Sequence, residues 1–283
     1  MRLYEVNSER IICVGDLHGN FDSFHYWLKN FVFKNTTIIV CGDVGLGFHK
    51  LGYYKQELKK INTFCKKNDC FVFLFRGNHD DPSYFGDISK FVFDRVRAIP
   101  DYSVIQTKLE GNVTHNILCV GGGLSIDRTW RIQQYSLDTI KYARFVGTSL
   151  TEAQSNVLPS YWEDEMPTFN EKALNELVEN GIKVDIVCTH TCPSFVGLKD
   201  KDGVSGWMER DKDLEKDLDS EREVMDVLFN KLKEDGHPIT DWVYGHFHRH
   251  MDEQIDGINF TMLDMCYPPK NRFDGLEFSS LET

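Results

Sequence analysis

The sequence has no long apolar run, and this absence limits where the protein can act. No stretch approaches the roughly 18 consecutive apolar residues that a membrane helix requires. The N-terminal segment MRLYEVNSERIICVGD also lacks the uninterrupted apolar stretch of a secretion signal. We therefore expect no membrane as a partner and no export from the cell.

Positive charge is scarce as well. The 283 residues include 32 Lys and Arg against 44 Asp and Glu, which gives a net charge of −12. Binding to long nucleic acid relies on a basic surface that displaces counterions from the phosphates, and the mean field of this chain opposes it. We expect no long nucleic acid as a partner, whereas a nucleotide or a short strand is compatible with the charge.

Cysteine pairs with metal-binding spacing are absent. None of the eight cysteines forms a CxxC pair. Four of them lie inside short apolar runs, where a free thiol behaves as a small buried hydrophobe: Cys13, Cys41, Cys119 and Cys188. Reduced thiols of this kind indicate a cytoplasmic protein.

The sequence does contain an alternation of strand-like and helix-like segments. Near-continuous apolar runs at residues 10–15, 36–42 and 71–77 predict strands that are covered on both faces. Helical spacing at residues 21–33 and 51–68 separates these strands. The β-α-β-α-β order favours a parallel sheet with right-handed crossovers, and we expect a single α/β domain over residues 1–283.

The second half of the chain is less regular. Residues from about 121 to 169 have weak periodicity, and we predict an irregular insertion there, made of loops with one short helix. The polar tail after Cys266 is expected to be peripheral. Between these segments, regular elements are predicted as helices at 170–180 and 220–234, strands at 184–189 and 241–244, and paired antiparallel strands at about 253–264.

Five of the β-rich runs end in residues that can bind a metal. The five ends are Gly15-Asp16-Leu17-His18, Gly42-Asp43, Gly77-Asn78-His79-Asp80, Thr189-His190 and Gly245-His246-Phe247-His248. In open α/β sheets, binding sites form beyond the carboxyl ends of the strands. The glycines allow sharp turns and a close approach of the backbone. Carboxylates, an amide and imidazoles are therefore predicted around one crevice.

These side chains suit a pair of metal ions that activates water for hydrolysis. Neutral imidazole binds zinc, iron, nickel and manganese, and carboxylate or amide oxygen favours the harder members of that set. An aspartate that bridges two ions about 3.5–4 Å apart is what two-metal hydrolysis requires. We expect two metal ions as cofactors, drawn from Mn²⁺, Fe²⁺ or Fe³⁺, Zn²⁺ and Ni²⁺.

The five blocks resemble the calcineurin-like metallophosphoesterase superfamily, whose motifs run D-x-H, G-D, G-N-H-D/E, H and G-H-x-H. All five occur here in that order from Asp16 to His248, over most of the chain. The resemblance implies a four-layer α/β sandwich, in which two mixed β-sheets are flanked by helices. It also implies a metal-dependent phosphoesterase.

The resemblance further implies a role for each motif residue. The first metal is bound by Asp16, His18 and His248. The second metal is bound by Asn78, His190 and His246. Asp43 bridges the two ions. His79 faces the scissile phosphate, where it stabilises charge or protonates the leaving oxygen, and Asp80 orients the His79 imidazole.

Two arginines are further candidates. Arg128 and Arg131 follow a triple glycine in a stretch that resembles a bacterial and phage branch of the superfamily, as does the Trp-acidic segment at residues 161–165. Guanidinium groups suit phosphate oxygens, so both arginines are candidates for binding the substrate. The alternative is that they pin the insertion onto the core.

The second block bears on the class of phosphoester. Protein Ser/Thr phosphatases of this superfamily carry G-D-x-x-D-R-G there, whereas this chain has GDVGLG, which counts against an enzyme of that type. We predict a phosphomonoesterase that acts on a protein or small-molecule substrate. The nearest alternative is a phosphodiesterase or nuclease acting on nucleotides or short nucleic acid. A non-catalytic scaffold is the third, although such modules are expected to lose metal ligands and none is lost here.

Overall fold

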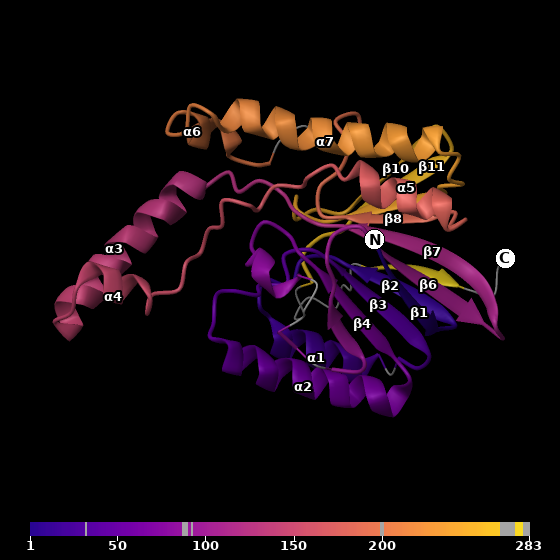
Figure 1. The fold of residues 1–283 in the computed structure, drawn as a ribbon, viewed down its shortest axis with the longest axis horizontal. Coiled ribbons are helices and arrows are strands. Elements are labelled where there is room, and N and C mark those ends of the chain that lie inside the picture. Colours follow the sequence, from indigo (N-terminus) through magenta and orange to yellow (C-terminus); the bar gives the residue numbers. More distant parts are fainter. Residues whose placement is uncertain (32, 87–89, 92, 199–200, 267–274, 280–283) are drawn as a thin grey trace.

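The structure is a computed structural model, and it describes residues 1–31, 33–86, 90–91, 93–198, 201–266 and 275–279. Two β-sheets pack face to face, and helices cover the outer face of each (Figure 1). The predicted α/β sandwich of two mixed sheets is confirmed. Within the residues just given, no helix is both long and apolar enough to cross a membrane.

The smaller sheet has the strand order β12-β2-β3-β4-β5. Its parallel strands are β2 (Arg10–Val14), β3 (Thr36–Cys41), β4 (Phe71–Phe75) and β5 (Val96–Ala98). Its outer face is covered by α1 (Phe21–Asn30) and α2 (Leu51–Asn68). The predicted parallel β-α-β-α-β unit is therefore confirmed. The tail after Cys266 was expected to be peripheral, and residues 267–274 and 280–283 of it lie outside the described residues. The described part, β12 (Gly275–Ser279), instead extends this sheet by antiparallel pairing with β2.

The larger sheet has the order β1-β6-β7-β8-β9-β11-β10. Its strands are β1 (Arg2–Asn7), β6 (Ser103–Leu109), β7 (Asn112–Val120), β8 (Ile186–Thr189), β9 (Asp241–Tyr244), β10 (Met251–Ile255) and β11 (Ile258–Met262). Helices α5 (Glu171–Glu179) and α7 (Leu214–Glu234) cover its outer face, and the short α6 (Val204–Met208) precedes α7. The predicted antiparallel pair near residue 258 is β10 with β11. A 3-10 turn, η1 (Pro82–Tyr84), follows the loop after β4.

Each strand near the centre contributes to two cores. Along β3, Ile38 and Val40 pack beneath α1 and α2, whereas Ile39 and Cys41 face the other sheet. Burial on both faces explains why the strand sequences are apolar throughout. All eight cysteines are free and buried, as expected of reduced core thiols. The core shared by the two sheets supports a single domain over 1–283, which stays a prediction.

The prediction of an irregular insertion at about 121–169 is wrong in its secondary structure. The segment contains α3 (Arg128–Val146), which is 19 residues long, and α4 (Leu150–Gln154). These helices stand away from the two sheets (Figure 1). Among the side chains of α3, Thr139 and Ala143 are buried. A helix that buries so little does not need the apolar stripe by which a helix is found in a sequence.

Candidate metal centre

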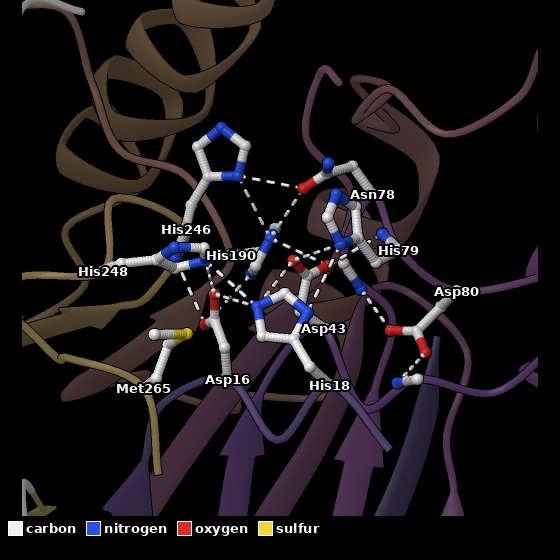
Figure 2. Close-up of polar contacts among 12 residues, drawn as sticks. Asp16, His18, Asp43, Asn78, His79, Asp80, His190, His246, His248 and Met265 are labelled. Carbon is white, nitrogen blue, oxygen red and sulfur yellow. Dashed lines mark hydrogen bonds and ion pairs between the residues drawn. The ribbon is translucent and has the colours of Figure 1, made fainter. Parts of the chain in front are cut away.

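The seven predicted ligands meet at one edge of the two sheets, beyond the carboxyl ends of five strands (Figure 2). Asp16 and His18 follow β2, Asp43 follows β3, Asn78 follows β4, His190 follows β8, and His246 and His248 follow β9. Parallel strands end at the same edge of a sheet, so segments far apart in the chain come together there.

Several of these residues have a strained backbone. Asp43, His18, His248 and His246 have φ angles of 44°, 46°, 55° and 73°, in the left-handed region that L residues seldom adopt. Such conformations cost on the order of 1–3 kcal/mol each and persist where the surrounding structure enforces them, which is common at functional sites. The strain is therefore concentrated at the strand ends that carry the candidate ligands.

Four donor atoms surround a first candidate position: Asp16 Oδ2, His18 Nε2, Asp43 Oδ2 and His248 Nε2. Nε2 of His18 and Nε2 of His248 are 3.0 Å apart, and the latter is 3.1 Å from Asp16 Oδ2. Asp43 Oδ2 is 3.8 Å from His18 Nε2. The four side chains can present ligand atoms that all lie within 4.8 Å of one another.

A second group of donor atoms lies beside the first. Asn78 Oδ1 is 2.9 Å from His246 Nδ1 and 3.0 Å from His190 Nε2, and these two nitrogens are 3.2 Å apart. Asp43 Oδ1 is 3.2 Å from His190 Nε2. Asp43 thus directs one carboxylate oxygen to each group, which is the position of a bridging ligand (Figure 2).

The donor set can be tested for its fit to cations. Asp16 Oδ2 and Asp43 Oδ2 are buried, and neither has a hydrogen-bond partner in the described part of the chain. Asp16 Oδ2 approaches His248 Nε2 in a geometry that makes no hydrogen bond. A buried carboxylate oxygen without a partner is costly unless positive charge neutralises it. Carboxylate oxygens of this kind, surrounded by imidazole nitrogens and an amide oxygen, fit two bound cations.

Burial and nearby carboxylates set the protonation states of the two histidines in the second group. His190 lies with Nδ1 2.9 Å from the carbonyl oxygen of Cys41, so the neutral ring donates there and keeps the lone pair of Nε2 for the site. Burial holds the pKa of His246 well below its ordinary value. Against the effect of burial, the carboxylates of Asp43 and Asp16 raise the pKa of His190 to about 9. The metal-free His190 therefore carries a proton that a cation must displace in order to bind Nε2.

His79 borders both groups without joining either. Its backbone N–H donates to Asp43 Oδ1 over 2.8 Å, and its ring nitrogen Nδ1 is 3.3 Å from Nδ1 of His18. Nε2 of His79 accepts an N–H from Arg131 Nη2 over 2.9 Å. Burial lowers the pKa of His79 well below its usual range, and the guanidinium of Arg131 adds to this effect. The imidazole is therefore neutral in the absence of substrate.

Asp80 does not orient the His79 ring, so that prediction is wrong. Its two carboxylate oxygens accept four backbone N–H groups, from Val44, Gly45, Leu46 and Gly77. Burial and the nearby carboxylate of Asp43 raise the pKa of Asp80 to about 7, although the backbone donors oppose the change. Asp80 ties the loop after β3 to the loop after β4, and it positions His79 through the backbone.

The two candidate arginines have different surroundings. Arg131 donates to Asp127 over 2.7 Å and to the carbonyl of Ser160 over 3.0 Å, and these bonds hold its third nitrogen against His79. Arg128 forms ion pairs of 2.6 Å with Asp211 and 2.7 Å with Asp217. Substrate binding by Arg131 therefore stays a prediction. Arg128 fits the alternative, in which its ion pairs attach the insertion to the core.

A cavity of about 270 Å³ opens beside the two groups. Its lining includes Asn78, His79 and His248, together with the cationic side chains of Arg131, Lys201 and Arg249. Arg249 is paired with Asp202, whereas no hydrogen bond or ion pair of the Lys201 ammonium is found among the described residues. A larger cavity of about 670 Å³ lies between α1 and α2 and contains none of these side chains.

Sequence reasoning missed four residues near the site. Ser125 and Glu165 lie in the glycine-rich and Trp-acidic segments, but neither was identified as a partner of a ligand. Arg249 directly follows the last histidine pair. Lys201 lies in a run of alternating charges that gave no signal, because such runs are usually solvated.

Comparisons with known proteins agree with the fold. A family model described as calcineurin-like phosphoesterase matches residues 9–250, a span that includes all of the candidate ligands. No curated protein matches the sequence.

Among solved structures, a dimetal phosphatase from Danio rerio is 13% identical with a TM-score of 0.50, and the match covers 96% of this chain and 93% of that one. A phosphopantetheinyl hydrolase from Mycobacterium tuberculosis is 13% identical with a TM-score of 0.41, over 96% and 97% of the two chains. GAP50, the anchor in the inner membrane complex of Plasmodium, is 12% identical with a TM-score of 0.42, over 95% and 81%. At these identities the likeness concerns the fold, and the Danio rerio structure supports it.

Proposed function

The chain belongs to the calcineurin-like phosphoesterase family, and on that premise we propose that it hydrolyses a phosphomonoester, of a protein or a small molecule, with the help of two metal ions. Membership of the family makes the protein a metal-dependent phosphoesterase. The two-ion site, the residues that form it and the class of ester are the parts of the proposal that go further.

The observation that carries the two-ion site is the pair of donor groups that share Asp43. Its oxygens Oδ1 and Oδ2 face different groups, and Asp16 Oδ2 and Asp43 Oδ2 have no other partner among the described residues. Two bound ions supply an acidified water and neutralise charge on the phosphate. The mixed nitrogen and oxygen donors are compatible with Mn²⁺, iron, Zn²⁺ and Ni²⁺.

His79 and Arg131 act on the substrate side. Arg131 provides a permanent positive charge, and its Nη2 already lies 2.9 Å from His79 Nε2. A phosphate dianion that accepts the N–H of Arg131 frees His79 Nε2 and brings negative charge beside the ring. Because a neighbouring negative charge favours imidazolium, substrate binding raises the pKa of His79 and prepares it to donate a proton to the leaving oxygen.

The cavity lining supports a monoester over a diester. A phosphomonoester carries up to two negative charges and three terminal oxygens, whereas a diester carries one charge. The cavity that His79 lines has three cationic side chains, Arg131, Lys201 and Arg249, although the whole chain has a net charge of −12. The lining also contains two carboxylates, Asp127 and Asp202, which are paired with Arg131 and Arg249, so the excess is the one cation Lys201. A local excess of cations in an acidic protein favours the more highly charged ester. The same net charge supports our prediction that long nucleic acid is not a partner.

A comparison of two model substrates tests the proposal. We expect the chelator-stripped protein, reloaded separately with Mn²⁺, Fe²⁺, Zn²⁺ or Ni²⁺, to hydrolyse p-nitrophenyl phosphate faster than bis-p-nitrophenyl phosphate. The reverse order establishes the diesterase alternative. No turnover of either compound, with both ions bound, establishes the scaffold alternative.

The cellular location remains a proposal. The eight cysteines are free and buried, and unpaired thiols persist in reducing compartments. We retain the cytoplasm as the expected location, and fractionation of cells that express the protein tests it.

A further inference from the structure

The orientation of the Asn78 amide requires an explanation. Oδ1 of Asn78 faces His246 and His190 at 2.9 and 3.0 Å, which makes it the end that can bind a cation. A side-chain amide has an acceptor at one end and a donor at the other, and a flip of 180° places the NH2 group in the same position. That group cannot bind a cation, so something must fix the amide.

The donor end of the amide is held by Ser125. Nδ2 of Asn78 donates to Ser125 Oγ over 2.9 Å, and both side chains are buried. Ser125 in turn makes two hydrogen bonds to Glu165: its N–H donates to Oε1 over 2.7 Å, and its hydroxyl donates to Oε2 over 2.7 Å. The NH2 group of Asn78 can only donate, so the oxygen of Ser125 presents a lone pair to it. The two bonds to Glu165 hold Ser125 in the position where its oxygen does so.

Glu165 is itself fixed in place through its backbone carbonyl group. Its carbonyl oxygen accepts N–H groups from Arg76 Nη1 at 2.7 Å and from the backbone of Gly123 at 3.1 Å. Its side chain is fully buried. Ser125 precedes α3 in the chain and Glu165 follows α4, so the contact between them holds both ends of the helical segment beside the site.

We propose that Glu165 is a positioning residue for Asn78, which acts through Ser125 to keep the amide oxygen directed at the second cation. The proposal rests on the two-ion site proposed above and gives the segment at 121–169 a role in building it. The contact between Ser125 and Glu165 sets the affinity of the protein for one of the two cations. The affinity for the other cation depends on Asp16, His18 and His248.

Metal titration of four variants tests the chain of contacts. Isothermal titration of the chelator-stripped protein with Mn²⁺ is expected to show two binding events. We expect Glu165→Ala and Ser125→Ala to weaken one event by about 10- to 100-fold and to leave the other at its wild-type affinity. Ser125→Thr keeps the hydroxyl and should restore the weakened event. Glu57→Ala, which removes a buried glutamate paired with Lys60 on α2, is the matched control and should leave both events unchanged.

The double variant separates positioning from a general loss of structure. If Glu165 acts through Ser125, the combined Ser125→Ala and Glu165→Ala variant should be no weaker in Mn²⁺ binding than Ser125→Ala alone. Additive losses, an equal loss at both events, or wild-type affinity in Glu165→Ala overturns the proposal while the two-ion site stands. If the wild-type protein binds no pair of ions, the two-ion site and this proposal both fall.

Discussion

Gly77 lies against the carboxylate of Asp43, so closely that a Cβ atom on Gly77 would stand 2.1 Å from Asp43 Oδ1. The same crowding occurs before two other candidate ligands. A Cβ on Gly42 would lie 2.2 Å from His190 Nδ1, and one on Gly245 would lie 2.3 Å from Asp16 Oδ1. Each glycine is therefore required by a close approach between two strand ends, and the site cannot assemble around a larger residue.

The first prediction concerns Gly77→Ala. The added methyl group must displace the bridging carboxylate, and a shift of about 1 Å at a catalytic group lowers activity by on the order of 100-fold. Turnover and Mn²⁺ affinity measure the effect. The control is Gly52→Ala in α2, where a Cβ meets nothing within 4 Å and should stabilise the fold by about 0.5–1 kcal/mol. Wild-type activity in Gly77→Ala would falsify the crowded geometry.

Asp43→Asn should abolish turnover. The amide has nearly the same shape, but it carries no negative charge and offers one acceptor oxygen where the site uses two, so it cannot bridge two cations. Elemental analysis of the purified variant should find fewer bound ions than in the wild-type protein. His246→Ala should have a similar effect, since it removes one donor from the second group. Near-normal turnover in either variant contradicts the assignment of ligands.

His79→Ala should separate catalysis from metal binding. The ring belongs to neither donor group, so the variant should hold the wild-type metal content. Loss of a proton donor should slow turnover by about 10²- to 10⁴-fold, with the larger effect on esters that have poor leaving groups. Rates with phenyl phosphate and p-nitrophenyl phosphate measure the contrast. A variant that loses metal shows that His79 has a ligand role.

Arg131→Met and Lys201→Met should each lower kcat/KM for a monoester more than for a diester. Each loses a charged donor in the cavity, which corresponds to about 1.5–3 kcal/mol in kcat/KM for a dianionic substrate. Arg128→Met is the control, because Arg128 is occupied by Asp211 and Asp217. Equal losses for p-nitrophenyl phosphate and bis-p-nitrophenyl phosphate argue against a cavity selective for dianions.

The protonation of His79 gives a prediction that depends on pH. In the metal-free protein, burial holds the pKa of His79 well below its ordinary value, although Asp43 acts in the opposite direction, and Arg131 lowers it further. The ring resonances of His79 in nuclear magnetic resonance spectra should therefore not titrate near pH 6.5. In Arg131→Met the pKa should rise toward that value without reaching it, because the burial remains.

The effect of this pKa on stability has a definite sign. The unfolded chain protonates His79 near pH 6.5 and the folded chain does not, so the unfolded state binds more protons below that pH. The contribution of His79 to the free energy of unfolding therefore falls as the pH falls. The decrease in the free energy of unfolding between pH 7 and pH 5 should be smaller in Arg131→Met than in the wild-type protein. Urea unfolding of both metal-free proteins at the two pH values measures this decrease.

The sequence by itself determined the strand ends and the residues they carry. Asp16, Asp43, Asn78, His190 and His246 each follow an apolar run and a small or polar turn residue. These features depend on neighbours a few positions away, because strand formation and sharp turns are governed by local backbone sterics and by the periodicity of burial. The strand ends were enough to predict one crevice beyond a parallel sheet, whereas the two-sheet sandwich around it was implied by the family resemblance.

The tertiary structure alone decided which side chains support those ends. Arg131 reaches His79 across 52 residues, Asn78 reaches Ser125 across 47, and Ser125 reaches Glu165 across 40. Asp80 accepts backbone N–H groups from a different loop, and α3 is a helix with few buried side chains. Contacts of this kind depend on where separate segments pack in space, which no local spacing in the sequence records.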